Sequence, residues 1–79
     1  MNNVNQLLQQ LVNGNAINLE DFYSVRLNKG EIALQGTMDA DKLAKYRQGL
    51  NIETTNVTES GYVQLALTID NILITFVLT

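Results

Sequence analysis

Two aspartates separated by one residue, in Asp39-Ala40-Asp41, open like the calcium loop of an EF-hand. The later positions of that loop do not follow. The fifth and twelfth places hold Leu43 and Leu50, and the sixth holds Ala44 where the loop requires glycine. Carboxylates in the first turn of a helix are favoured by capping and by the helix dipole. The sequence therefore predicts capping groups here and no metal site.

Basic residues gather at Lys42, Lys45 and Arg47, with Tyr46 among them. Cations beside an aromatic ring are typical of a small anion or nucleic-acid site. Three charges neutralise few phosphates, and the chain as a whole has a net charge of −3, so such binding would be weak. Nucleic acid is an alternative partner and not the expected one.

The absence of cysteine and histidine restricts the remaining chemistry. Thiol and Ser-His nucleophiles, zinc sites, haem and iron–sulfur centres all need one of these residues. The five glycines stand singly, so the sequence has no phosphate-cradling loop. No spacing pairs a serine, tyrosine or lysine with a base. We therefore expect no catalytic residue, no metal and no cofactor.

Length and composition predict one domain over residues 1–79. The chain is 46% hydrophobic and 16% charged, which is too apolar for a disordered segment. Domains of this size are often held by disulfides or a structural metal, and this chain has the residues for neither. A well-filled core or association with another chain must supply that stability. No secretory signal or membrane-spanning stretch is visible, so we expect a cytoplasmic protein.

Helical periodicity predicts a first helix that ends near Gly14, with Asn2 or Asn3 as its N-cap. Its apolar stripe consists of Val4, Leu7, Leu8, Leu11 and Val12. Its opposite face, the amide face, carries only neutral side chains: Gln6, Gln9, Gln10 and Asn13. Loss of charge is a feature of interface cores, so the amide face is a candidate contact surface beside the alternative of ordinary polar surface.

A second helix is predicted over 40–48. Asp39 is its expected N-cap, Met38 packs on Leu43 as a hydrophobic staple, and Gly49 follows the last turn. Asp41 is expected to pair with Lys45 one turn later. The residues expected to face the core are Leu43, Ala44, Ala40 and Tyr46.

Alternating apolar residues predict strands over 22–27, 31–35, 52–58, 62–69 and 72–79. Lys29-Gly30 turns the first hairpin, which sets Leu27 opposite Ile32 and Val25 opposite Leu34. Asp70-Asn71 turns the last hairpin. Its four apolar pairs are Ile69 with Ile72, Leu67 with Ile74, Leu65 with Phe76, and Val63 with Leu78.

The strand over 52–58 is expected at an edge of the sheet, where a turn at Ser60-Gly61 would place Thr54 and Asn56 on the apolar face. The strand over 72–79 is so apolar that it must be central, covered or paired with another chain. The predicted fold is α+β in the order α-β-β-α-β-β-β, a mainly antiparallel sheet with both helices on one face.

The other face of this sheet is the main candidate interface. Leu73 and Val77 alternate with the core positions of the last strand and must point away from the helices, joined by Tyr62, Ala66 and Phe22. Exposed apolar patches of this kind mark interaction sites. The alternatives are scattered apolar surface residues or coverage by the linker over 15–21.

In its general character, a tiny, cysteine-free, acidic α+β chain, the sequence resembles the small accessory proteins of bacteriophages and mobile elements, some of which block host defence systems. The resemblance implies a protein of the host cytoplasm that binds and inhibits a host protein. A phage structural or assembly protein would have the same character. We expect a non-enzymatic protein–protein interaction module, homo-oligomeric and with a protein partner. It would act through the open sheet face, a strand edge or the amide face.

Overall fold

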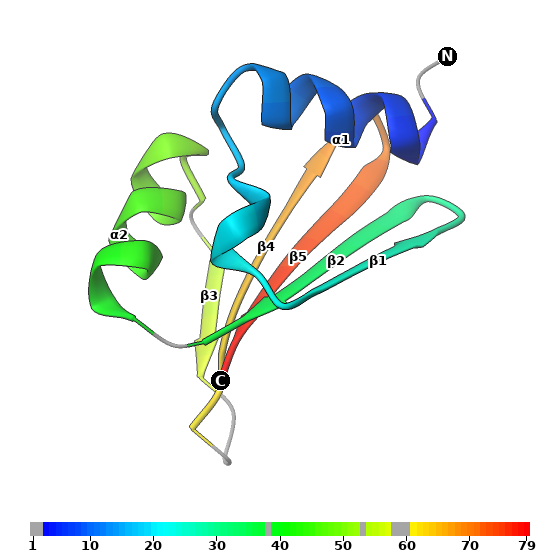
Figure 1. The fold of residues 1–79 in the computed structure, drawn as a ribbon. Coiled ribbons are helices and arrows are strands. Elements are labelled where there is room, and N and C mark those ends of the chain that lie inside the picture. Colours follow the sequence, from blue (N-terminus) through cyan, green and yellow to red (C-terminus); the bar gives the residue numbers. More distant parts are fainter. Residues whose placement is uncertain (1–2, 38, 53, 58–60) are drawn as a thin grey trace.

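The computed structural model describes residues 3–37, 39–52, 54–57 and 61–79. Two helices and a 3-10 turn lie on one face of a five-stranded sheet (Figure 1). The elements are α1 Val4–Asn13, η1 Leu19–Asp21, β1 Ser24–Asn28, β2 Glu31–Gly36, α2 Ala40–Gly49, β3 Thr54–Val57, β4 Val63–Ile69 and β5 Ile72–Leu78. The predicted α+β fold and its element order are confirmed.

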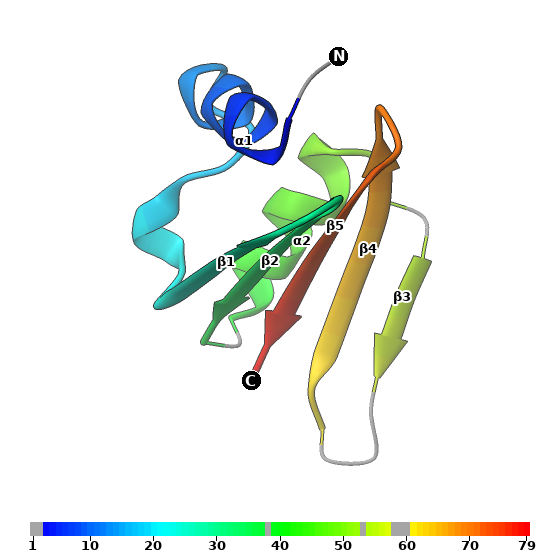
Figure 2. The same ribbon diagram turned by 90° about the vertical axis from the view of Figure 1, so that its right-hand side faces the viewer.

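The strands lie in the order β1-β2-β5-β4-β3, which Figure 2 shows from left to right with α2 behind them. Neighbouring strands are antiparallel except for β2 and β5, which are parallel. The apolar strand β5 is therefore central, between β2 and β4. Because β5 is paired on both sides, its backbone N–H and C=O groups are not exposed at an edge of the sheet, where they could pair with another chain.

Both hairpins have the predicted registers. In the first, Leu27 lies opposite Ile32 and Val25 opposite Leu34. In the second, all four predicted apolar pairs form, from Ile69–Ile72 to Val63–Leu78. Asp70 and Asn71 both have positive φ, 53° and 66°, as a two-residue turn that matches the strand twist requires.

The core lies between the sheet and the helices. Tyr46 of α2 stacks on Phe76 of β5 with ring centroids 5.2 Å apart, and Phe22 lies against both rings. Ile17 of the linker is only 1% exposed. The linker therefore packs on the helix side and does not cover the other face of the sheet. The buried apolar residues are Leu7, Ile17, Ile32, Leu34, Tyr46, Ile52, Val63, Leu65, Ile72, Ile74, Phe76 and Leu78.

Capping fixes the start of both helices. The Asn3 side chain accepts a hydrogen bond from Gln6 N at 2.8 Å, and Gln6 Oε1 accepts one from Asn3 N at 3.3 Å. In α2, Asp39 Oδ1 accepts from Asp41 N at 2.8 Å and from Lys42 N at 3.1 Å. The prediction of Asp39 as N-cap is confirmed, and the proposed Met38 staple lies outside the described residues.

Part of the predicted core face of α2 is wrong. Tyr46 is buried and Leu43 packs on the core, but Ala40 and Ala44 are exposed. The stripe that meets the sheet runs through Leu43, Tyr46 and Leu50, because the large ring of Tyr46 reaches Phe76 and sets the rotation of the helix. The helix also includes Gly49, and Leu50 is its C-cap.

Strand β3 is at an edge, as expected, but its predicted register is wrong. Val57 lies opposite Val63 and Thr55 opposite Leu65, so Thr55 and Val57 share the helix side. The turn at Ser60-Gly61 would have paired the strands one residue out of this register. Strand β3 ends at Val57 and β4 begins at Val63, and the expected turn at Ser60-Gly61 lies partly outside the described residues. A shift of one residue in the pairing exchanges the two faces of a strand.

Candidate protein interface

The face of the sheet that carries no helix presents three rows of side chains across β1, β2, β5 and β4. We call these residues the outer sheet face. The first row is Ser24, Gln35, Val77 and Gln64, the middle row is Arg26, Ala33, Thr75 and Ala66, and the third row is Asn28, Glu31, Leu73 and Thr68. Figure 2 looks toward this face.

A hollow of about 390 Å³ lies at the centre of the outer sheet face, and Ala33, Thr75, Leu73 and Val77 are among the residues that line it. The side chains of the middle row are short on β2 and β5, whereas Leu73 and Val77 flank them on β5. Leu73 is 40% exposed and Val77 is half-buried. The face is therefore concave and apolar along β5.

Two residues of the outer sheet face are ionisable, Arg26 and Glu31, and their charges are opposite. They lie one strand and one row apart, because Arg26 is opposite Ala33 and Glu31 is opposite Asn28. Neither side chain has an ion-pair partner among the described residues. The face is thus electrically balanced, although the whole chain has a net charge of −3.

The structure places most of the residues predicted for this face where the strand alternation puts them, and their role as an interface stays a prediction. Leu73 and Val77 point away from the core, as their alternation with the buried positions of β5 predicts. Tyr62 is 44% exposed just before β4, and Ala66 is in the middle row.

Phe22 is not part of the outer sheet face, and this prediction is wrong. Its ring centroid lies 5.3 Å from that of Tyr46 and 5.8 Å from that of Phe76, on the helix side. A bend at Tyr23 breaks the alternation on which the prediction relied. Gly36 leaves the space: a Cβ there would lie 3.1 Å from the Phe22 ring and 2.6 Å from Asp21 O.

The amide face of α1 is exposed at all four predicted residues, Gln6, Gln9, Gln10 and Asn13. Of these, Gln6 also closes the N-terminal cap. Because α1 packs on the helix side, the amide face and the outer sheet face lie on opposite sides of the sheet (Figure 1). The structure does not bring the two predicted surfaces together, so they are separate candidates.

A polar cluster on the helix side was missed from the sequence. Tyr46 Oη donates a hydrogen bond to Asp21 Oδ2 at 2.6 Å, and Lys45 Nζ donates to the same oxygen at 3.0 Å. Lys45 thus pairs with Asp21 and not with Asp41 as predicted. The two partners lie 24 residues apart, so no local pattern indicates this contact.

The cluster shifts two pKa values. The Tyr46 hydroxyl, and after it the Lys45 ammonium, hold the pKa of Asp21 below its usual 3.8 against the opposing effect of burial. Burial, followed by the bond to Asp21, raises the pKa of Tyr46 from 10.0 to about 12. Both shifts favour the state with an ionised aspartate and a neutral tyrosine, so the cluster is a structural link between η1 and α2.

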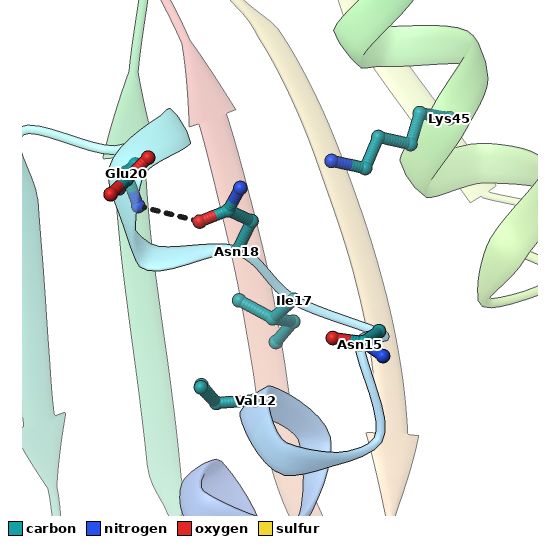
Figure 3. A pocket seen from close by; sticks show the side chains of 6 residues that line it. All are labelled: Val12, Asn15, Ile17, Asn18, Glu20 and Lys45. Carbon is teal, nitrogen blue, oxygen red and sulfur yellow. Dashed lines mark hydrogen bonds between the residues drawn. The ribbon is translucent and has the colours of Figure 1, made fainter.

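A groove of about 520 Å³ lies beside this cluster, between the end of α1, the linker and α2 (Figure 3). Its polar groups already serve the fold. Asn18 Oδ1 accepts from Glu20 N at 3.0 Å, and Lys45 is held by Asp21. Lys42 Nζ likewise donates to Asp21 O and Thr37 O. Two of the three cations in the predicted nucleic-acid patch are thus engaged within the chain, and that alternative gains no support.

Two further observations bear on the sequence predictions. Over the described ranges of the chain, no three acidic side chains are grouped so that they could hold a metal ion. No helix in these ranges is long and apolar enough to cross a membrane.

Comparison of the chain with models of protein families, with curated proteins and with solved structures gives no match.

Proposed function

We propose that this chain is a non-enzymatic protein–protein interaction module that forms a homo-oligomer through the outer sheet face. The observation that carries the proposal is the contrast between the two sides of the sheet. On the helix side, α1, the linker and α2 cover the centre of the sheet and leave apolar residues of the sheet exposed only on the edge strands, at Val25, Leu27 and Val57. On the side without helices, Leu73, Val77 and the hollow between them lie on the central strand β5 and its neighbours. Concave apolar surface of this kind is favourable to bury.

The size of the outer sheet face sets the size of the dimer interface. With strands about 4.8 Å apart and a rise of about 3.3 Å per residue, the four strands and three rows of the outer sheet face cover roughly 19 by 17 Å, or about 320 Å² before side-chain relief. A standard interface takes about 800 Å² of accessible surface from each partner. The outer sheet face is smaller than this, so a homodimer that joins through it would have a small interface.

The charges support a second copy as the occupant. Two copies of a chain with net charge −3 repel each other at most surfaces. The outer sheet face carries one cation and one anion, Arg26 and Glu31, so two such faces can meet without an excess of either charge. A domain that contains neither cysteine nor histidine also gains stability from association.

A separate partner can bind at the same time. The amide face of α1 stays free when two outer sheet faces join, because it lies on the other side of the sheet. The host protein implied by the resemblance to phage accessory proteins, and a host cytoplasmic location, stay predictions.

Sedimentation velocity at micromolar concentration tests the proposal. We expect the wild type to sediment at twice its 8.8 kDa mass and the Leu73→Lys/Val77→Lys variant at 8.8 kDa with an unchanged circular dichroism spectrum. The matched control is Gln9→Lys/Asn13→Lys, which adds two lysines to the amide face and should keep the wild-type mass. A monomeric wild type, or a folded double-lysine variant with unchanged mass, contradicts the proposal.

A further inference from the structure

The charged residues and the hollow of the outer sheet face also favour one particular arrangement of the two copies in the dimer. We infer a symmetric dimer in which Arg26 of each copy pairs with Glu31 of the other, while Leu73 of each copy enters the other's central hollow. The two-fold axis would cross the strands between the middle and third rows. This inference rests on the proposed function, because it requires that two outer sheet faces meet.

The two charged residues of the outer sheet face lie in different rows on neighbouring strands. Arg26 is in the middle row on β1, and Glu31 is in the third row on the neighbouring strand β2. Both line the central hollow, and neither has an ion-pair partner among the described residues. An arginine and a carboxylate that both lack an ion-pair partner among the described residues, on one face of the sheet, favour a partner that supplies the opposite charge at each position.

The position of the two-fold axis decides which residues of the two copies meet. When two identical sheets pack face to face, an axis across the strands keeps each strand over its own copy and reverses the order of the rows. An axis through the middle row would set Arg26 against Arg26 of the partner copy. An axis along β5 would set β1 over β3 and separate Arg26 from Glu31. The first arrangement is disfavoured by repulsion between the two arginines. The second is disfavoured because Arg26 and Glu31 of the two copies are too far apart to pair.

An axis between the middle and third rows exchanges these rows. Glu31 of the partner copy then comes over the middle row, one strand from Arg26, a lateral separation of about 4.8 Å. The arginine side chain is long enough to cover this separation across two packed sheets. The two-fold axis repeats the contact, so each dimer has two Arg26–Glu31 pairs.

The same axis also fits the shape of the outer sheet face. On β5, exchange of the two rows brings Leu73 of the partner copy over Thr75. Thr75 is only 8% exposed, and with Ala33 it lines the hollow, so there is room above it. The axis that pairs the charges therefore also places the most exposed leucine of β5 in the hollow. Val77, in the first row, would lie beyond the overlap.

Charge reversal tests this arrangement directly. In Arg26→Glu, two glutamates face each other at each contact, and in Glu31→Arg two arginines do. We expect each variant alone to dimerise about tenfold to a hundredfold more weakly than the wild type at low salt. An equimolar mixture of the two variants should regain wild-type affinity, because every contact in the mixed dimer joins opposite charges. The variant with both substitutions in one chain should also regain it.

The matched control for Arg26→Glu is Arg47→Glu. It makes the same change in net charge at an exposed position of α2 and should leave the affinity of the dimer unchanged. The inference is overturned if either single variant dimerises like the wild type, or if the mixture is no tighter than its components. If these results accompany a monomeric Leu73→Lys/Val77→Lys variant, the arrangement fails and the proposed function stands. A folded double-lysine variant that still dimerises overturns both.

Discussion

The charged residues on the two sides of the sheet differ in whether they have partners within the chain. On the helix side, Asp21 accepts bonds from Tyr46 and Lys45, and Lys42 donates to two carbonyl oxygens. On the outer sheet face, Arg26 and Glu31 have no ion-pair partner among the described residues, and Leu73 is 40% exposed. The polar cluster of the helix side is thus held by contacts within the chain, whereas the outer sheet face presents an exposed leucine and two charges without an ion-pair partner among the described residues, as the proposed dimer requires.

The largest expected effect is the loss of a core aromatic ring. Phe76→Ala removes the ring that stacks on Tyr46 and should lower the free energy of unfolding by about 3–5 kcal/mol. A small domain has only about 5–15 kcal/mol in total, so the variant would be close to unfolding. Urea denaturation followed by circular dichroism measures the loss.

The control for this prediction is Leu73→Ala on the outer sheet face, measured at a concentration low enough for the chain to be monomeric. It should cost less than about 1 kcal/mol, because Leu73 is not part of the core. Equal losses from the two variants would remove the distinction between the two sides.

A smaller effect is expected from the hydroxyl of Tyr46. Tyr46→Phe leaves the Asp21 carboxylate and the Asn18 amide without a bond to it and should cost about 1–3 kcal/mol of unfolding free energy. Tyr23→Phe is the matched control, since the hydroxyl that it removes binds Thr79 Oγ1 in an exposed position. The account requires a clearly smaller loss for the control, measured by the same denaturation.

The local features of this fold could be predicted from sequence, and the reason is physical. Asp39 caps the backbone of residues two and three places away, and Asp70-Asn71 sets the register of its own hairpin. The position of Phe22 could not be predicted, because it depends on space left by Gly36 on another strand. The same holds for the parallel pairing of β2 with β5, since nothing in either strand specifies the other as its neighbour.

The candidate site divides in the same way. Strand alternation was sufficient to predict the direction of Leu73 and Val77. The rows that bring Arg26 near Glu31 and open the hollow at Thr75 require the order of four strands. The Asp21–Tyr46 bond needs the packing of α2 on the linker, which no local spacing encodes.

The pH dependence of stability should include contributions from Asp21 and Tyr46 of the polar cluster on the helix side. The pKa of Asp21 is lowered by folding, so its contribution is present above the unfolded value and is lost as pH falls through the folded value. The pKa of Tyr46 is raised from 10.0 to about 12, so its contribution is full below pH 10 and is lost as pH rises toward 12. Midpoints of urea denaturation across pH measure both losses.

Variants of the cluster separate these two contributions. Asp21→Asn should abolish the part of the acid loss that Asp21 causes, and Tyr46→Phe the alkaline loss. If the wild type and Tyr46→Phe lose stability in parallel above pH 10, the assigned role of Tyr46 is wrong.

The smallest expected effect on stability comes from filling the hollow. Ala33→Leu places a larger side chain on the outer sheet face and should change the unfolding free energy of the monomer by no more than about 0.5 kcal/mol. The same change should weaken the dimer, because it occupies space that Leu73 of the partner copy needs. A variant that dimerises as tightly as the wild type would show that the hollow is not part of the interface.

The claim that the outer sheet face joins two copies is tested most directly by two-dimensional amide NMR spectra of the wild type over a dilution series. The account predicts that the signals that move on dilution belong to the outer sheet face, above all Ala33, Leu73 and Thr75, while those of the amide face of α1 stay fixed. Signals that stay fixed throughout, or that move only at Gln6, Gln9, Gln10 and Asn13, would contradict it.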